Sequence, residues 1–178
     1  MQEIHEKDVK YALEHGVEEL KLIHKRILEL YIELGDTEAM IRSTSMKSSK
    51  YGFVSGGGAK WDLSDLLQKH EVLQKQREIE IKEQIWRLTD EEAMINRIRT
   101  CYQTLRGEEY NFLQKLYVQK KPYKSVEKDS GVSHRTFEKI RKTAMRKVIS
   151  LFESNYSNQE IITMGHSYRK RECGREKT

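Results

Sequence analysis

The stretch "DSGVSHRTFEKI", residues Asp129–Ile140, joins two segments of helical spacing through a single glycine. It has two interpretations, an ordinary helix end followed by a new helix or the tight turn of a helix-turn-helix. The second needs a turn that glycine tolerates and a following helix that apolar residues hold on one side. Val126 precedes the glycine, Phe137 and Ile140 follow it at helical spacing, and Ser133 can cap the second helix. The spacing therefore favours the helix-turn-helix.

The helix predicted after this turn, roughly His134 to Phe152, has two chemically different faces. Its apolar side carries Phe137, Ile140, Ala144 and Val148. Its other side carries His134, Arg135, Glu138, Lys139, Lys142 and Arg146. Cationic and hydrogen-bonding side chains of this kind can contact phosphates and base edges in a DNA major groove.

Positive charge is concentrated around this motif. The whole chain has a formal net charge of +5, whereas residues 119–150 alone carry +7 and residues 1–40 carry −5. A basic module on an acidic body is typical of a protein that binds a polyanion such as DNA. The alternative is a Lys-rich helix face that is only solvated, as in a helical scaffold that binds no DNA.

The composition predicts an all-α protein. Only 37% of the residues are hydrophobic, 34% are charged and there is a single proline, which suits helices with one apolar stripe. We expect helices over 8–34 and 61–88 to form a long hairpin, joined by the Ser/Gly-rich loop 43–60. The sequence therefore predicts a first domain over residues 1–88. The apolar stripes of its helices predict that it self-associates into a homo-oligomer. The DNA-binding domain is predicted over 89–153, followed by a disordered tail, 154–178.

The C-terminal half resembles the DNA-binding region of bacterial sigma factors. The resemblance covers roughly residues 92–152 and is carried by "YKSV", "GVS", the Phe137 and Ile140 positions and "IRKTAMRKV". With long helices upstream, the chain looks like the ArpU/RinA type of phage and prophage transcriptional regulators. It departs from the sigma pattern at Glu127, where alanine is usual, and at Ser130, where an apolar residue is usual.

The resemblance implies sequence-specific binding of double-stranded DNA and control of late phage genes, with RNA polymerase as a candidate partner. In sigma factors the first residues of the second helix read bases. The predicted base-facing residues are Ser133, His134, Arg135, Thr136, Glu138 and Lys139. The predicted phosphate contacts are Lys120, Lys121, Tyr123, Lys124, Lys142 and Arg146.

Other functions are less well supported by the sequence. No acid pair, nucleophile–base set or phosphate loop stands out, so we expect neither an enzyme nor a cofactor. The cysteines and histidines have no metal-ligand spacing. We find no apolar run long enough to span a membrane and no signal peptide, and expect a cytoplasmic protein of a bacterial host. A phage DNA-packaging protein of the small terminase type remains an alternative, because it also joins a helix-turn-helix to an oligomerising helical part.

Overall fold

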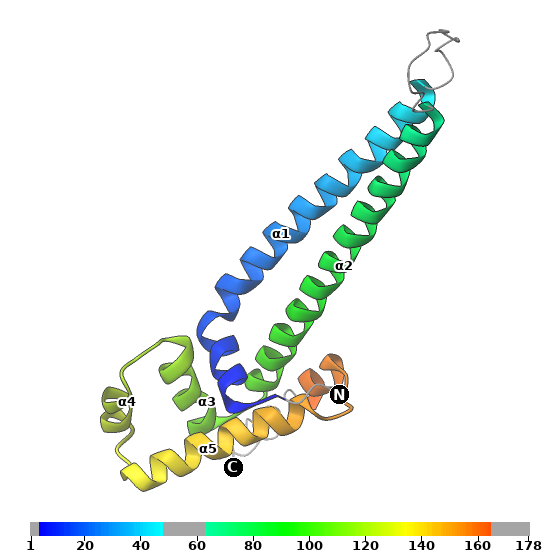
Figure 1. Cartoon of the computed structure of the whole chain (residues 1–178). Coiled ribbons are helices and arrows are strands. Elements are labelled where there is room, and N and C mark those ends of the chain that lie inside the picture. The colour runs from blue at the N-terminus through cyan, green and yellow to red at the C-terminus, as the bar shows by residue number, and fades with distance from the viewer. Residues whose placement is uncertain (1–3, 48–62, 165–178) are drawn as a thin grey trace. The chain divides into compact units, whose positions relative to one another are not determined.

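The computed structural model describes residues 4–47 and 63–164, with side chains for residues 4–36 and 68–164 (Figure 1). These residues form helices joined by short turns, and no strand occurs among them, which confirms the all-α prediction. In chain order the elements are α1 (Glu6–Lys47), α2 (Leu63–Gln103), α3 (Gly107–Leu113), the π-helix η1 (Gln114–Val118), α4 (Tyr123–Ser130) and α5 (His134–Phe152).

The chain divides into two compact units, one of which combines two segments that are far apart in the sequence. The core unit comprises Met1–Leu20 and Glu92–Thr178, and the helix-pair unit comprises Lys21–Glu91. Both long helices continue from one unit into the other. Residues 1–20, which were predicted to belong to the domain of the helical hairpin, instead group with the C-terminal part of the chain.

The core unit is built around a single apolar cluster. Its fully buried side chains include Ile98 of α2, Leu113 of α3, and Phe137 and Val148 of α5. The N-terminal part of α1 supplies Val9, Ala12 and Leu13 to the same cluster.

A close approach within the core unit explains a glycine in α1. A Cβ atom at Gly16 would lie 3.0 Å from the Cγ2 atom of Ile95 on α2. Glycine therefore lets the first turns of α1 lie against α2 without displacing that side chain.

The helix-pair unit has a much smaller apolar core. Leu30 of α1 and Ile81 and Ile85 of α2 form a buried cluster. Arg77 donates hydrogen bonds to Glu33 next to it, at 2.5 and 3.0 Å. Leu73, Ile81 and Ile85 follow helical spacing in the predicted helix 61–88, which predicts that all three are buried, but Leu73 is 63% exposed and the prediction is wrong for it.

The helices extend beyond the boundaries that local signals predicted. α1 passes through Gly35 to Lys47, so residues 43–47 of the predicted Ser/Gly loop are helical, while 48–60 lie outside the described residues. α2 also passes through Thr89, the first residue of "TDEE", whose capping threonine and acidic side chains predict a helix start at the boundary of the predicted domain 89–153. The Thr89 hydroxyl donates to the carbonyl of Ile85 at 2.8 Å and caps nothing. A glycine inside a helix, such as Gly35 in α1, costs only about 1 kcal/mol of helix stability relative to alanine, which packing of the helix can offset.

The predicted disordered tail begins with ordered structure. Residues 158–164 are helical, and Ile161 is fully buried in the core cluster. Ser157 and Glu160 form a capping box, with the Ser157 amide donating to Glu160 at 2.7 Å and the Glu160 amide to Ser157 at 3.2 Å. The prediction was wrong for this segment, and the "SNQE" signal could have corrected it. Residues 165–178 lie outside the described residues.

Candidate nucleic-acid interface

The turn between α4 and α5 is built by a glycine and a serine (Figure 1). Gly131 ends α4 in the left-handed conformation, with φ 67° and ψ 6°. Ser133 is extended, and its hydroxyl accepts from the Thr136 amide at 3.3 Å, which confirms the predicted cap of α5. A left-handed residue suits glycine, and the cap satisfies a free N–H of the first turn.

Phe137 fixes α5 on the elements beneath it. Its side chain is fully buried. The centroid of its ring lies 4.6 Å from that of Phe112 on α3 and 5.1 Å from that of Tyr123 on α4. Val126 of α4 is buried in the same cluster. The apolar side of α5 is therefore held by α3 and α4, which leaves the opposite side facing outward.

The two departures from the sigma pattern are accommodated by polar contacts. The carboxylate of Glu127 lies 2.9 Å from Nδ1 of His134. The Ser130 hydroxyl donates to the carbonyl of Glu127 at 2.6 Å and accepts from the Val132 amide at 3.4 Å. Hydrogen bonds thus bridge α4 and the first turn of α5.

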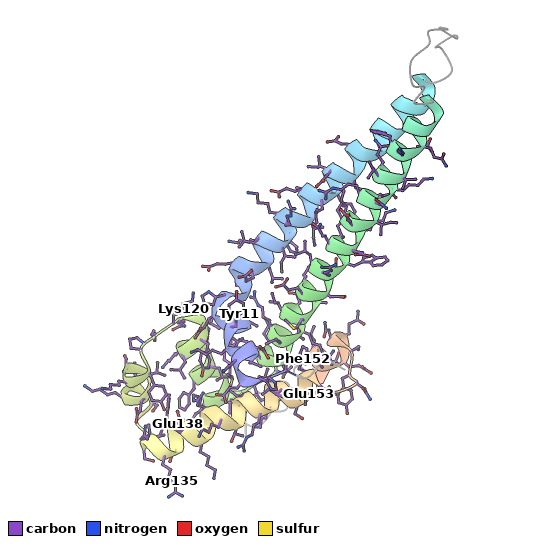
Figure 2. All side chains as sticks on the ribbon, viewed as in Figure 1. Tyr11, Lys120, Arg135, Glu138, Phe152 and Glu153 are labelled. Carbon is purple, nitrogen blue, oxygen red and sulfur yellow. The ribbon has the colours of Figure 1, made fainter. Side chains whose placement is uncertain are left out.

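The predicted base-facing residues fall into two groups. Arg135 and Lys139 are exposed and form no ion pair within the described part of the chain, and Arg135 projects outward from the first turn of α5 (Figure 2). Ser133 and Thr136 are exposed but share the cap, with their hydroxyls 2.9 Å apart. His134 is exposed and paired with Glu127, as described above.

Glu138 is held inward by its neighbours. It accepts from the hydroxyl of Tyr123 at 2.5 Å and from the guanidinium of Arg141 at 3.1 and 3.2 Å. Arg141, whose side chain is only 15% exposed, also donates to Glu6 at 2.7 Å and to the hydroxyl of Tyr117 at 2.9 Å. We call these five residues the Arg141 network. It joins the first turn of α1 to η1, α4 and α5.

The charges of the Arg141 network stabilise one another. The hydrogen bond from Arg141, followed by that from Tyr123, lowers the pKa of Glu138. Burial acts to lower the pKa of Arg141, but hydrogen bonds to Glu138, Glu6 and Tyr117 raise it overall. Burial first, then the bond to Glu138, raises the pKa of Tyr123. At neutral pH Glu138 and Arg141 are therefore ionised and Tyr123 is a neutral donor.

Neither Arg141 nor Glu6 was among the residues predicted from the sequence to have a function. Arg141 lies four residues after Phe137, on the inward side of α5, and an arginine at such a position is a signal that it has an internal partner. Nothing local to the sequence identifies that partner, because Glu6 is 135 residues away.

The predicted phosphate contacts are also divided. Lys120, Lys121, Lys124 and Arg146 are exposed, and Lys142 is exposed with its Nζ 4.0 Å from Glu138. Lys120 has φ 52°, a left-handed conformation uncommon for a residue with a side chain. Tyr123 points its hydroxyl to Glu138, so it supports the turn from inside.

Other kinds of site find little support in the described residues. They contain no group of three or more histidine, cysteine or acidic side chains placed to hold a metal ion. None of their helices combines the length and apolarity needed to cross a bilayer. A hollow of about 520 Å³ between α3, α5 and residues 158–164 is lined by both apolar and polar side chains, and Lys147 and Glu109 pair there at 2.6 Å. Burial raises the pKa of the Cys101 thiol to about 11, which makes it a poor nucleophile.

Comparison with protein-family models, with curated proteins and with solved structures finds no match to this chain.

Proposed function

We propose that the core unit binds double-stranded DNA through a helix-turn-helix made of α4 and α5, with α5 in the major groove. The observation that carries the proposal is the pair Arg135 and Lys139, which are exposed on the first two turns of a helix whose other side is pinned by Phe137. The left-handed Gly131 supports it, because such a turn sets the second helix at an angle to the first.

Arg135 and Lys139 are the proposed base readers. Arginine and lysine donate to the O6 and N7 acceptors of guanine, and the N-terminal residues of a recognition helix are those that reach base edges. Ser133 and Thr136 are close enough in sequence to add hydroxyl contacts. His134 and Glu138 have internal partners, so we assign them the role of positioning the turn and α5.

The proposed phosphate contacts surround this helix. Exposed lysines precede α4, and Lys142 and Arg146 follow along α5. Each charge that neutralises a phosphate releases counterions, so binding should weaken steeply as salt rises. The lysines before α4 are Lys120 and Lys121, and Lys124 lies in its first turn.

The biological role is proposed from the resemblance of the sequence. A regulator of phage or prophage late genes that acts with RNA polymerase fits a sigma-like module on an oligomerising helical part. A DNA-packaging protein of the small terminase type is the second candidate, and it would use the same DNA-binding surface. A helical scaffold without DNA binding is the third.

A gel-shift series against salt tests the DNA binding. Arg135→Ala and Lys139→Ala should each weaken binding by about 1–3 kcal/mol and relax sequence preference. Lys124→Ala should weaken binding to all DNA sequences alike. It should also reduce the slope of log affinity against log salt concentration by about one unit. Lys25→Ala, an exposed lysine of the helix-pair unit, is the control and should change nothing. Unchanged affinity and preference in both α5 variants would reject the proposal.

Recovery of bound genomic DNA separates the biological roles. Enrichment upstream of a late operon supports the regulator, and enrichment at a packaging site supports the terminase-like protein. A chain that recovers no DNA above background leaves only the scaffold.

A further inference from the structure

A stripe of exposed apolar side chains follows α2 within the helix-pair unit. It consists of Val72, Ile79 and Trp86, which are 49%, 58% and 70% exposed. They are spaced seven residues apart, so at 100° per residue each lies within about 20° of the next and all three share one side of α2. We call them the α2 stripe.

The α2 stripe lies on the side of α2 that faces away from α1. At 100° per residue, Ile79 is about 160° around the helix from Ile81, which is buried against Leu30 of α1. The contact with α1 therefore leaves the stripe uncovered.

The helix-pair unit buries little apolar surface of its own. Among residues 21–36 and 68–91 of this unit, the buried large apolar side chains are Ile23, Leu30, Ile81 and Ile85, and eight others of that kind are exposed. A pair of helices with so small a core gains little stability from burial, whereas a partner on the stripe would remove tryptophan and isoleucine surface from water.

Charges beside the α2 stripe suit a second copy of α2 that runs parallel to the first. On a helical wheel, Lys82 lies on one flank of the stripe and Glu83 on the other, at nearly the same height. In a parallel pair the opposite flanks of the two copies meet, so Lys82 faces Glu83 of the other copy, and the reverse pair forms by symmetry. Glu71 and Lys69 are related in the same way at the other end.

An antiparallel pair is disfavoured by the same wheel. In an antiparallel pair whose two-fold axis passes next to Ile79, each flank of the stripe faces the same flank of the other copy. Lys75 and Lys82 lie on one flank, so Lys75 of one copy then faces Lys82 of the other. Like charges in these positions repel.

We propose that the α2 stripe is the seam of a parallel homodimer, in which Val72, Ile79 and Trp86 each pack against the same residue of the second copy. The inference concerns the helix-pair unit alone and does not depend on DNA binding. It names the surface, the partner and the direction for the self-association that the sequence indicates.

Sedimentation equilibrium of the full chain tests the seam. Wild-type protein should dimerise with rising concentration, and Ile79→Glu or Trp86→Glu should leave only monomer, because two buried carboxylates would face each other. Ile32→Glu on α1, a side chain 59% exposed, is the matched control and should still dimerise. A wild-type monomer at every concentration, or a dimer that survives both α2 substitutions, would overturn the inference. Circular dichroism of each variant checks that its helices persist.

Cross-linking tests the direction. Val72→Cys in a Cys173→Ser background should oxidise to a covalent dimer, because a parallel pair brings residue 72 of both copies together. Buried Cys101 stays out of the reaction, and Ile32→Cys in the same background is the control. In an antiparallel pair residue 72 would lie opposite residue 86, so a dimer that fails to cross-link through Val72→Cys refutes the parallel arrangement.

Charge reversal gives a second measure of direction. Lys82→Glu should weaken the dimer several-fold, and Lys82→Glu combined with Glu83→Lys should restore it. A stronger dimer with Lys82→Glu alone would instead point to the antiparallel pair, where the substitution relieves repulsion with Lys75.

Discussion

Replacing Gly131 with alanine should destabilise the core unit by about 1 kcal/mol. The left-handed conformation at φ 67° costs an L-residue about 1–2 kcal/mol. No heavy atom lies within 4 Å of the position a Cβ would take, so steric repulsion adds nothing. Alanine also restricts the unfolded chain, which offsets about 0.4–1 kcal/mol of that cost. Asparagine, which tolerates this conformation, should fall between glycine and alanine.

The same substitution at Gly35 is the matched control. Gly35 lies within α1, is exposed, and a Cβ there would also meet nothing within 4 Å. Its backbone is helical, so Gly35→Ala should stabilise the helix-pair unit by up to about 1 kcal/mol. Identical chemistry should therefore have opposite signs at the two glycines, because only their backbone conformations differ.

The measurement must follow the correct unit. Trp86 lies in the helix-pair unit and α5 contains no tryptophan, so tryptophan fluorescence would not report on α5. Amide hydrogen exchange along α5 reports on the core unit. A loss of 1 kcal/mol in its free energy of unfolding corresponds to about fivefold faster exchange of amides that exchange through unfolding. The left-handed turn is not the constraint that we infer if the α5 amides of Gly131→Ala exchange as slowly as those of the wild type. The same holds if Gly131→Ala and Gly35→Ala shift stability in the same direction.

Three further predictions concern other contacts of the core unit. Arg97 donates to three backbone carbonyls at and beyond the end of α5, at 2.6–2.9 Å, so Arg97→Met should cost about 2–3 kcal/mol in urea unfolding and speed proteolysis of residues 153–164. The lowered pKa of Glu138 contributes stability that is present above the unfolded pKa of about 4.3 and is lost as pH falls through the folded value. Acid titration should therefore destabilise wild type more than Glu138→Gln. Cys101, with its pKa near 11, should react with iodoacetamide only as fast as the protein unfolds, as mass spectrometry would record.

The features that sequence predicted best are those fixed by short-range chemistry. The Ser133 cap and the glycine turn depend on neighbours within a few residues, and the inward side of Phe137 follows from the helical period of α5; the structure has all three as expected. Helical period places a side chain on a face but does not identify its partner. The link between Arg141 and Glu6 could not be predicted for that reason, nor could the assignment of residues 1–20 to the core unit.

Helix boundaries failed where a local signal competed with packing. "TDEE" at residues 89–92 has the composition of a helix start, yet α2 runs through it without a break. Ile85 before the motif and Ile95 after it are both buried, so packing holds the helix on either side. A capping side chain contributes only about 1 kcal/mol, too little to end a helix whose flanks are both anchored.

The Arg141 network changes what the outer face of α5 can offer to a polyanion. From sequence alone, Glu138 counts as a carboxylate among the cations of that face, where it would repel phosphate. In the structure Arg141 and Tyr123 hold this carboxylate against the turn and stabilise its charge from the inside. Arg135 and Lys139 then face outward beside a carboxylate that is turned inward and paired, so Glu138 competes with phosphate for them less than an exposed carboxylate would.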